Sequence, residues 1–359
     1  MRSMAYGNSQ LVILAGGSGS SLWPLSTKDK PKQFIDVTGC GRTLLQQTYD
    51  RFEDIFPPDN VWVVTNKKYK CLIREQLPQV PQANILLEPC SRNTAPSIAY
   101  VSWRIKCINP KANVVVTPSD HIVTDVNEFR RVIRLCMRFT EGTDASVMIG
   151  VRPTYPETGY GYIQADLTSC SPRNTEIFRI DSFCEKPTLP MAEKYISRRN
   201  FFWNAGIFVW NVGTIVNAFR VFSPQIGKVF EGLVGIYGTE EEQQLIDCHY
   251  SECENISVDY AIMEKVEEVY VCPATFGWCD VGSWKSLLMR NRLDLYGNSV
   301  ISENVTLYET RGSIIYAPGA QKVVVQGGNN IIVANKDGEM LVCNIDEENC
   351  IQQFVDVPS

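Results

Sequence analysis

The chain has 359 residues, of which 44% are hydrophobic and 21% are charged, and its formal net charge is −6. These proportions are ordinary for a globular protein, and the length allows two domains or one large domain with an appendage. The negative net charge argues against general nucleic-acid binding, which favours a basic face. No stretch approaches the roughly 18 apolar residues of a membrane-spanning helix, so we expect no membrane partner.

The thirteen cysteines show no C-x-x-C spacing, and some lie inside apolar runs such as Leu135-Cys136-Met137. This placement favours reduced cysteines that act as small hydrophobic residues in a reducing compartment. The N-terminal stretch Met1–Gln10 is polar and lacks the pattern of a signal peptide. We therefore predict a cytoplasmic protein.

The first predicted strand, Leu11–Ala15, is a run of five apolar residues that leads directly into the glycine-rich stretch Gly16–Ser20. Glycines allow a sharp turn and a close approach to a bound group, and consecutive N–H groups in such a turn can bind an anion. With Lys32 following in the chain, this arrangement is typical of a phosphate-binding site. The stretch lacks the third glycine of a dinucleotide fingerprint and the G-K-[ST] of a P-loop. The glycines alone therefore fit a structural turn about as well as a ligand loop.

After this loop, predicted helices and short apolar strands alternate as far as Phe139. The predicted strands are Val61–Thr65, Ile85–Leu87 and Val114–Thr117, and the predicted helices are Thr43–Phe52, Lys67–Leu77, Thr94–Cys107 and Asn127–Phe139. Strands and helices that alternate at this spacing indicate a doubly wound, mostly parallel sheet.

From about Val147 the alternation becomes less regular. Predicted strands cover Val147–Val151, Tyr160–Ile163, Ile177–Cys184, Ala205–Trp210 and Val269–Ala274, and predicted helices cover Thr188–Arg198, a segment from Ser223 onward, and Ser257–Val266. Elaboration of this kind commonly builds a substrate lobe beside a nucleotide lobe.

The helical signal disappears from about Asn298. Short β runs follow at Val300-Ile301, Val305–Leu307, Ser313–Tyr316, Val323–Val325, Ile331–Val333 and Met340–Val342, with turns rich in Gly or Asn between them. We predict a small all-β tail domain that resembles a β-solenoid, because the runs recur roughly every 8–10 residues.

Two aspartates are candidates for metal binding. Asp120 follows a predicted parallel strand, and ligands of open α/β sheets bind at that edge, although an aspartate there also suits a simple turn or cap. Asp280 lies between two glycines and two tryptophans in Gly277–Trp284, which fits either a close-approach turn or a packed corner. The spacing of these two residues alone does not pair them.

Several strings, in order, together resemble the sugar-phosphate nucleotidyltransferases, and among them the mannose-1-phosphate guanylyltransferases (GDP-mannose pyrophosphorylases). The matching strings are Gly16–Leu25 with Pro31–Phe34, Glu88–Pro96, Pro118–His121, Gly159–Tyr162, Phe183–Pro187, Trp203–Phe208 and Gly277–Trp284. The resemblance implies a Rossmann-like nucleotidyltransferase domain over residues 1–295, with a nucleotide lobe at about 11–150 and a sugar-phosphate lobe at about 151–295. The β domain then covers residues 296–359.

The resemblance also implies roles for individual residues. The expected Mg²⁺ ligands are Asp120 and Asp280, and the expected catalytic residues are Lys32, Asp120, Lys186 and Asp280. The nucleotide would be bound by Ala15, Gly16, Gly17, Ser18, Gly19, Ser20, Ser21, Lys32, Glu88, Asn93, Thr94, Ser119 and Asp120. The sugar phosphate would be bound by Gly161, Glu185, Lys186, Asn204 and Asp280.

The implied reaction joins GTP and α-mannose 1-phosphate to give GDP-mannose and pyrophosphate, with Mg²⁺ as cofactor and a homodimer as the expected assembly. The sugar phosphate already carries an oxyanion nucleophile, so the reaction needs no covalent enzyme intermediate. Positioning and charge neutralisation then supply most of the catalysis.

Ser21 departs from the family pattern, which has arginine at this position. Arginine offers a planar cation suited to phosphate, whereas serine offers only a hydroxyl, and loss of one such donor costs on the order of 10²–10³ in rate. Two alternatives therefore stay open. The chain could be a nucleotide-sugar-binding homologue with low or no activity, or it could act on a different hexose 1-phosphate.

Overall fold

The computed structural model describes residues 8–17, 21–171, 174–290 and 293–355. These residues form two compact units. The first, the sheet unit, comprises Met1–Gly16, Asp50–Ser119 and Val123–Trp278, and the second, the C-terminal unit, comprises Gly17–Tyr49, Asp120–Ile122 and Cys279–Ser359. None of the helices in the described segments is both long and apolar enough to cross a membrane.

The sheet unit is built on a nine-stranded sheet with the order β3-β2-β1-β4-β9-β6-β10-β8-β7. Parallel pairing joins β1 to β2 and β4, β2 to β3, and β6 to β10, whereas β8 and β9 run antiparallel to their neighbours. The strands are β1 (Ser9–Leu14), β2 (Val61–Asn66), β3 (Ile85–Glu88), β4 (Asn113–Pro118), β6 (Ser146–Val151), β7 (Tyr162–Ser171), β8 (Asn174–Cys184), β9 (Phe201–Asn211) and β10 (Val269–Ala274). The predicted Rossmann-like, mostly parallel sheet is confirmed, with two antiparallel insertions.

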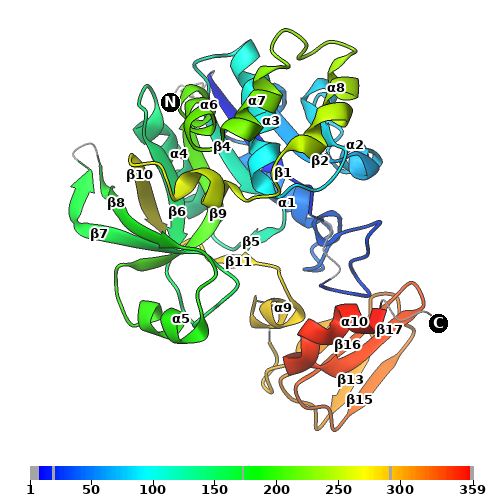
Figure 1. Cartoon of the computed structure of the whole chain (residues 1–359). Coiled ribbons are helices and arrows are strands. Elements are labelled where there is room, and N and C mark those ends of the chain that lie inside the picture. Colours follow the sequence, from blue (N-terminus) through cyan, green and yellow to red (C-terminus); the bar gives the residue numbers. More distant parts are fainter. Residues whose placement is uncertain (1–7, 18–20, 172–173, 291–292, 356–359) are drawn as a thin grey trace. The chain divides into compact units, whose positions relative to one another are not determined.

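Helices cover both faces of this sheet. The α-helices in the chain as far as β10 are α1 (Leu44–Phe52), which is divided between the two units, α2 (Lys70–Gln76), α3 (Thr94–Ile108), α4 (Val126–Thr140), α5 (Leu189–Ile196), α6 (Val212–Phe222), α7 (Pro224–Glu231) and α8 (Glu242–His249). Figure 1 shows α3, α6 and α7 side by side, in mutual contact, while α4 packs on β4, β6, β9 and β10. Because helices bury both faces of the sheet, side chains on both sides of the central strands are apolar, and these strands are continuous apolar runs in the sequence.

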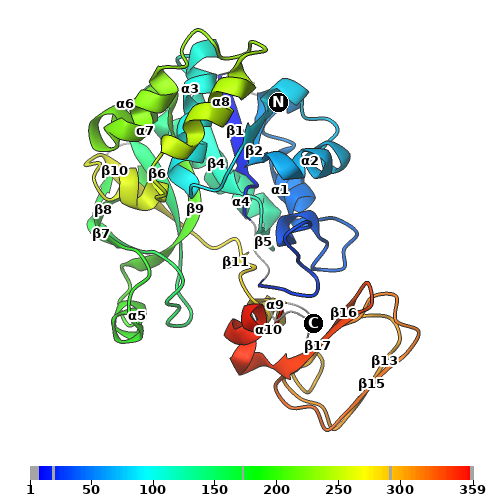
Figure 2. The ribbon, with the colours of Figure 1, turned by 45° about the vertical axis from the view of Figure 1, so that its right-hand side comes forward.

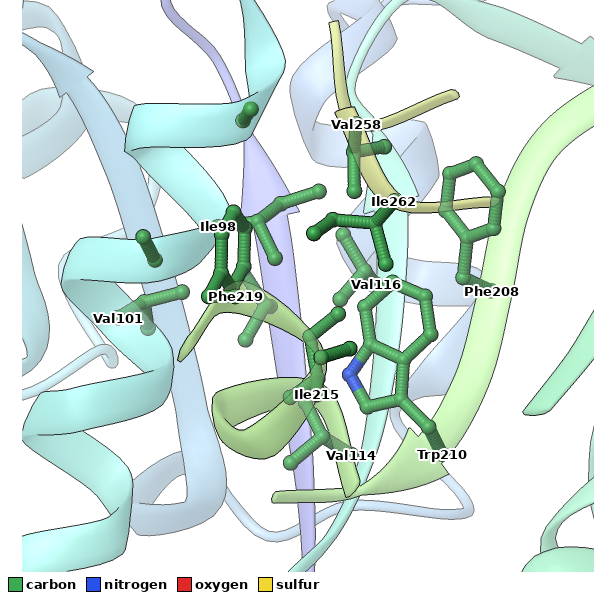
Figure 3. Close-up of a cluster of buried hydrophobic side chains, with 14 of the residues drawn as sticks. Ile98, Val101, Val114, Val116, Phe208, Trp210, Ile215, Phe219, Val258 and Ile262 are labelled. Atoms are coloured by element: carbon green, nitrogen blue, oxygen red, sulfur yellow. The ribbon is translucent and has the colours of Figure 1, made fainter. Parts of the chain in front are cut away.

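The main core lies between the sheet and the helices α3 and α6. Val114 and Val116 of β4 pack there against Ile98 of α3 and Phe219 of α6 (Figure 3). Val115 is equally buried but lies outside this cluster, because successive side chains of a strand point to opposite faces. Side chains on both faces of β4 are therefore buried.

Several elements of the sheet unit differ from the sequence-based prediction. Helices α6 and α8 were not predicted, whereas α7 lies where a helix was predicted from Ser223 onward. The helix predicted over Ser257–Val266 is limited to a π-helical turn, Asp259–Met263. This turn type is rare and often occurs at functional sites.

The C-terminal unit stacks its strands in the manner of a solenoid. Ser299 of β12 pairs in parallel with Ile314 of β14, Ile314 pairs with Ile332 of β16, and β13 pairs in parallel with β15. The strands are β12 (Ser299–Ile301), β13 (Val305–Tyr308), β14 (Ile314–Tyr316), β15 (Val323–Gln326), β16 (Ile331–Lys336) and β17 (Glu339–Asn344), the last of which pairs antiparallel with β16. The predicted β-solenoid-like tail is confirmed by this parallel register.

Two short helices, neither of which was predicted, complete the unit: α9 (Trp284–Arg290) and α10 (Ile351–Val355). They lie near one another in Figure 2, and both contribute to the core of the unit. This core joins apolar residues of the tail to residues of the segment 17–49; its members include Leu22, Leu25, Ile35, Val37, Leu44, Trp284, Ile314, Ile332, Leu341 and Ile351. Part of the apolar surface of the tail is therefore covered by the segment 17–49 of the same chain.

Candidate active site

Three charged side chains of the C-terminal unit meet although they lie far apart in the sequence. Lys32 begins a 3₁₀ turn, Lys32–Phe34. Asp120 comes directly before the short strand β5 (His121–Val123), and Asp280 ends β11 (Trp278–Asp280), which pairs with β5. This strand pairing brings the two aspartates of the distant strings Pro118–His121 and Gly277–Trp284 together.

Lys32 lies between the two aspartates. Its Nζ is 2.9 Å from Asp120 Oδ2 and 3.4 Å from Asp280 Oδ1, and it donates a 2.8 Å hydrogen bond to the carbonyl oxygen of Val281. Burial alone would lower the pKa of Lys32, but the two carboxylates outweigh it and hold that pKa above its ordinary value. Burial alone would raise the pKa of Asp120, but Lys32 and then His121 hold it below its ordinary value. The ammonium and the Asp120 carboxylate are therefore both charged at neutral pH.

The same carboxylates could hold a divalent cation. Potential ligand atoms of Asp120, His121 and Asp280 all lie within 4.8 Å of one another. Mg²⁺ prefers oxygen ligands and commonly takes only one or two carboxylates, completing its shell with water and substrate phosphates. The two aspartates fit that requirement, because they supply the carboxylate oxygens.

The described part of the glycine-rich loop is held by its neighbours. The backbone N–H of Ala15 donates to Val64 O at 2.8 Å, and Ala15 O accepts from Thr65 Oγ1 at 2.9 Å. The carbonyl oxygen of Gly17 accepts a 2.8 Å hydrogen bond from Gln33 Nε2, next to Lys32 in the chain. Ser18, Gly19 and Ser20 lie outside the described residues. Ser21 is half-buried in the turn that follows them.

Glu88, at the end of β3, is a buried carboxylate with two hydroxyl donors. Its Oε1 accepts hydrogen bonds from Ser97 Oγ and Tyr250 Oη. Its Oε2 lies so close to Gly16 that a Cβ added there would be 2.8 Å away. Burial raises the pKa of Glu88, and the two hydroxyl donors oppose that rise. The carboxylate thus links α3 and the segment after α8 to the start of the glycine-rich loop.

The residues at the start of α3 have local partners. Asn93 caps the helix: its side chain accepts from Thr94 N at 2.9 Å, and its φ of 63° places it in the left-handed region. The hydroxyl of Thr94 accepts from Val258 N at 2.9 Å. Ser119, after β4, is buried, and its N–H donates to Leu14 O at 3.1 Å. These contacts fix the strand ends where a nucleotide is expected.

A second cluster of polar residues lies at the ends of β7, β8 and β9. Glu185 follows β8, and its Oε2 lies where a side chain at Gly161 would be. The backbone N–H of Asn204 in β9 donates to Gly161 O at 2.8 Å. Lys186 is exposed and has a φ of 46°, a conformation that costs energy for a residue with a Cβ and often marks a functional site. The predicted sugar-phosphate residues Gly161, Glu185, Lys186 and Asn204 therefore lie together.

Asp259 joins this second cluster and was missed by the sequence analysis. It accepts a 2.8 Å hydrogen bond from Asn204 Nδ2. Burial, together with the nearby Asp259 charge, raises the pKa of Glu185 to about 7, while Lys186 opposes the rise. Burial also raises the pKa of Asp259 to about 6. The string around Asp259 carries no recognisable motif, and only its position on a rare π-helical turn marks it.

The family follows from a comparison with known proteins, since a family model described as nucleotidyl transferase matches residues 10–296. The chain belongs to the nucleotidyl transferase family. This nucleotidyl transferase is 34% identical over 349 residues to the mannose-1-phosphate guanylyltransferase of Escherichia coli. The aligned region covers 96% of this chain and 74% of the relative. It is 35% identical over 349 residues to the alginate biosynthesis protein AlgA of Pseudomonas fluorescens, covering 96% of this chain and 70% of that protein.

A solved structure supports the same assignment. It is a crystal structure described as mannose-1-phosphate geranyltransferase from Thermus thermophilus, with a TM-score of 0.86 and 30% sequence identity. The match covers 97% of this nucleotidyl transferase and 98% of that chain. The family predicted from the sequence is thus confirmed, and this protein is an enzyme of the nucleotidyltransferase class.

Proposed function

We propose that this nucleotidyl transferase moves GMP from GTP to α-mannose 1-phosphate, giving GDP-mannose and pyrophosphate. The observation that carries the proposal is 34% identity to a mannose-1-phosphate guanylyltransferase across 96% of the chain. The contacts of Lys32 with Asp120 and Asp280 support it, because a partly buried ammonium held by two carboxylates suits chemistry on polyphosphates.

The proposed step is a direct in-line displacement. A phosphate oxygen of mannose 1-phosphate forms a bond to the α-phosphorus of GTP, while the bond from that phosphorus to the bridging oxygen breaks. Pyrophosphate leaves with the bonding electron pair. The nucleophile is already ionised, so no side chain needs to remove a proton.

The chain's own residues supply position and charge. Lys32 neutralises charge near the α-phosphate, and backbone N–H groups of Gly16–Ser20 bind the triphosphate. Glu88 and Asn93 serve the guanosine side, where Ser97 and Tyr250 hold the Glu88 carboxylate. When bound at Asp120 and Asp280, Mg²⁺ would neutralise further phosphate charge.

The second cluster serves the sugar phosphate in this proposal. Glu185 accepts hydrogen bonds from sugar hydroxyls, and Asn204 offers its amide beside it. Lys186 is exposed and positive, so it binds the phosphate of the incoming sugar. Gly161 leaves room for the Glu185 carboxylate.

The decisive experiment measures pyrophosphate release from GTP, UTP, dTTP and ATP with a panel of hexose 1-phosphates. We expect the highest kcat/KM for GTP with mannose 1-phosphate, and loss of turnover in excess chelator that added Mg²⁺ restores. A preference for UTP or dTTP would rule out guanylyl transfer, and preference for another hexose would change the assigned sugar. Full activity in chelator would rule out the metal role.

The serine at position 21 favours one alternative, a homologue that binds nucleotide sugars with little turnover. Pyrophosphate release at a rate indistinguishable from the uncatalysed reaction, together with measurable GDP-mannose binding, would support it. The proposed homodimer is tested separately by light scattering of the full chain, where a monomer mass would refute it.

A further inference from the structure

We propose that Asp259 is a positioning residue of the sugar-phosphate site, which acts by holding the side-chain amide of Asn204 in one orientation. The inference rests on the proposed function, since it assigns a role to a residue beside the groups that would bind the sugar phosphate. Neither the family strings nor the sequence analysis drew attention to Asp259.

The amide of Asn204 is held at both ends. Its Nδ2 donates to Asp259 Oδ1 at 2.8 Å, and its Oδ1 accepts from the backbone N–H of Gly206 at 3.0 Å. An ionised carboxylate can only accept hydrogen bonds and a backbone N–H can only donate, so the two partners allow one amide orientation. The side-chain amide nitrogen of Asn204 has two N–H groups, and one of them donates to Asp259. The orientation of the amide also fixes the direction of the second N–H, which can donate to a sugar hydroxyl.

Asp259 is itself anchored by its flanking residues. It begins the π-helical turn Asp259–Met263. Val258, which precedes it in the chain, and Ile262 of the same turn are buried in the main core (Figure 3). The backbone N–H of Val258 donates to Thr94 Oγ1. The turn therefore holds Asp259 in a fixed position. A residue that orients the side chain of another residue needs such a fixed position.

The carboxylate also shapes the charge around Glu185. The titratable groups that face this pair are Lys186 beside Glu185, Tyr260 and Glu264 on or after the π-helical turn, and Cys184 at the end of β8. Lys186 is the one cation among these groups, and it lowers the pKa of both carboxylates, whereas Glu264 raises both. Replacing Asp259 by a neutral residue removes a negative charge next to Glu185.

The test is a double-mutant cycle with Asp259→Ala, Asn204→Ala and the double variant. KM is measured for mannose 1-phosphate and for GTP. We expect Asp259→Ala to raise KM for mannose 1-phosphate about tenfold, the effect of one lost hydrogen bond in a polar site, and to leave KM for GTP within about twofold. Because Asp259 acts through Asn204, the double variant should be no worse than Asn204→Ala alone.

Asp259→Asn is the conservative variant and keeps the test valid if Asp259→Ala does not fold. Its carbonyl oxygen can accept from Asn204, so we expect KM for mannose 1-phosphate to stay within about threefold of the parent value. The pH at which that KM begins to rise on acidification should also fall below the parent value near 7, because Glu185 loses a like-charged neighbour.

Two outcomes would overturn the inference. One is additive effects in the cycle, and the other is an equal rise of KM for both substrates. If the parent chain releases no pyrophosphate from this substrate pair, the proposed function fails by itself. The same cycle is then run on calorimetric binding of mannose 1-phosphate, where undetectable binding by the parent chain overturns the inference as well.

Discussion

The Lys32 ammonium is held between two carboxylates. Asp120 and Asp280 outweigh the cost of burying the ammonium, so the lysine stays charged at neutral pH. Removing one charged member of such a cluster leaves the opposite charges without a partner, and this lowers the stability of the folded state when the site is partly buried. The catalytic and structural effects of this lysine are therefore coupled.

Replacing Lys32 by alanine should lower kcat on the order of 10²–10³-fold, because one preorganised positive charge is lost at the phosphates. Pyrophosphate release at saturating substrates measures the change. Lys285→Ala is the matched control in the same unit, since Lys285 forms a solvent-exposed pair with Asp346 at 3.5 Å. A Lys32→Ala variant within threefold of the parent rate would contradict the role given to Lys32.

Restoring the family arginine with Ser21→Arg should raise kcat at saturating GTP by about tenfold or more, because arginine adds a planar cation beside the triphosphate. Ser21→Ala is the control, and it should leave the rate near the parent value if the hydroxyl contributes little. An unchanged or lower rate for Ser21→Arg would mean that another group already neutralises the triphosphate.

Glu185 should make the protein less stable as the pH rises. Its pKa in the folded state, about 7, lies above its ordinary value of 4.5, so between these values the folded chain holds a proton that the unfolded chain has lost. The contribution of Glu185 to the free energy of unfolding is therefore fully present below pH 4.5 and is lost as the pH rises through 7. The difference in unfolding free energy between the parent and Glu185→Gln, followed by urea unfolding from pH 4.5 to 8, should fall with pH. A constant difference would contradict the raised pKa.

At the scale of elements, two carboxylates at strand ends, Glu88 at the end of β3 and Glu185 after β8, each lie against a glycine of a neighbouring segment. A Cβ at Gly161, just before β7, would collide with Glu185 Oε2 and lie 2.8 Å from the Phe183 ring. Gly16 has the same relation to Glu88. Both glycines thus leave space for a carboxylate rather than supply a positive φ.

Gly161→Ala should therefore raise KM for mannose 1-phosphate about tenfold or more, because the displaced Glu185 loses its place at the sugar. KM for GTP should change little. Gly213→Ala is the control, since an added Cβ at Gly213 in α6 meets nothing within 4 Å. Equal kinetics for the Gly161→Ala variant and the parent would show that Glu185 does not contact the sugar.

At the scale of the whole molecule, the tail has a structural role within its own chain. Its residues Ile314, Ile332 and Leu341 share a core with Leu22 and Ile35, which flank the segment that carries Lys32. The tail has no phosphate or metal ligand among its predicted site residues. We infer that the tail holds that segment in place through the shared core.

Ile332→Ala should destabilise the C-terminal unit by about 2–5 kcal/mol, the usual cost of a cavity in a packed core. Turnover should decline at a lower temperature than in the parent chain, because the segment around Lys32 loosens with its core. Val342→Ala is the control, because it also truncates an apolar side chain, but one that is 59% exposed. It should leave the free energy of unfolding nearly unchanged. Equal thermal profiles for both variants would refute this role of the tail.

Much of the fold could be predicted from the sequence because the signals are local. The alternation of helices with apolar strands such as Val61–Thr65 predicts the parallel sheet, and the spaced β runs after Asn298 predict the stacked tail. The glycines, Lys32, Asp120, Glu185 and Lys186 stand in strings whose residue types suit phosphates and sugars. Periodicity and short motifs record such features directly in the chain.

Tertiary structure decided what depends on residues far apart in the sequence. Asn204 meets Asp259 across 55 positions and Glu88 meets Tyr250 across 162, so no local pattern marks Asp259 or Tyr250. The grouping of the segment 17–49 with the tail likewise follows from a shared apolar core. The sequence does not show which partner buries an apolar side chain, because the hydrophobic effect is non-directional and does not select a particular partner.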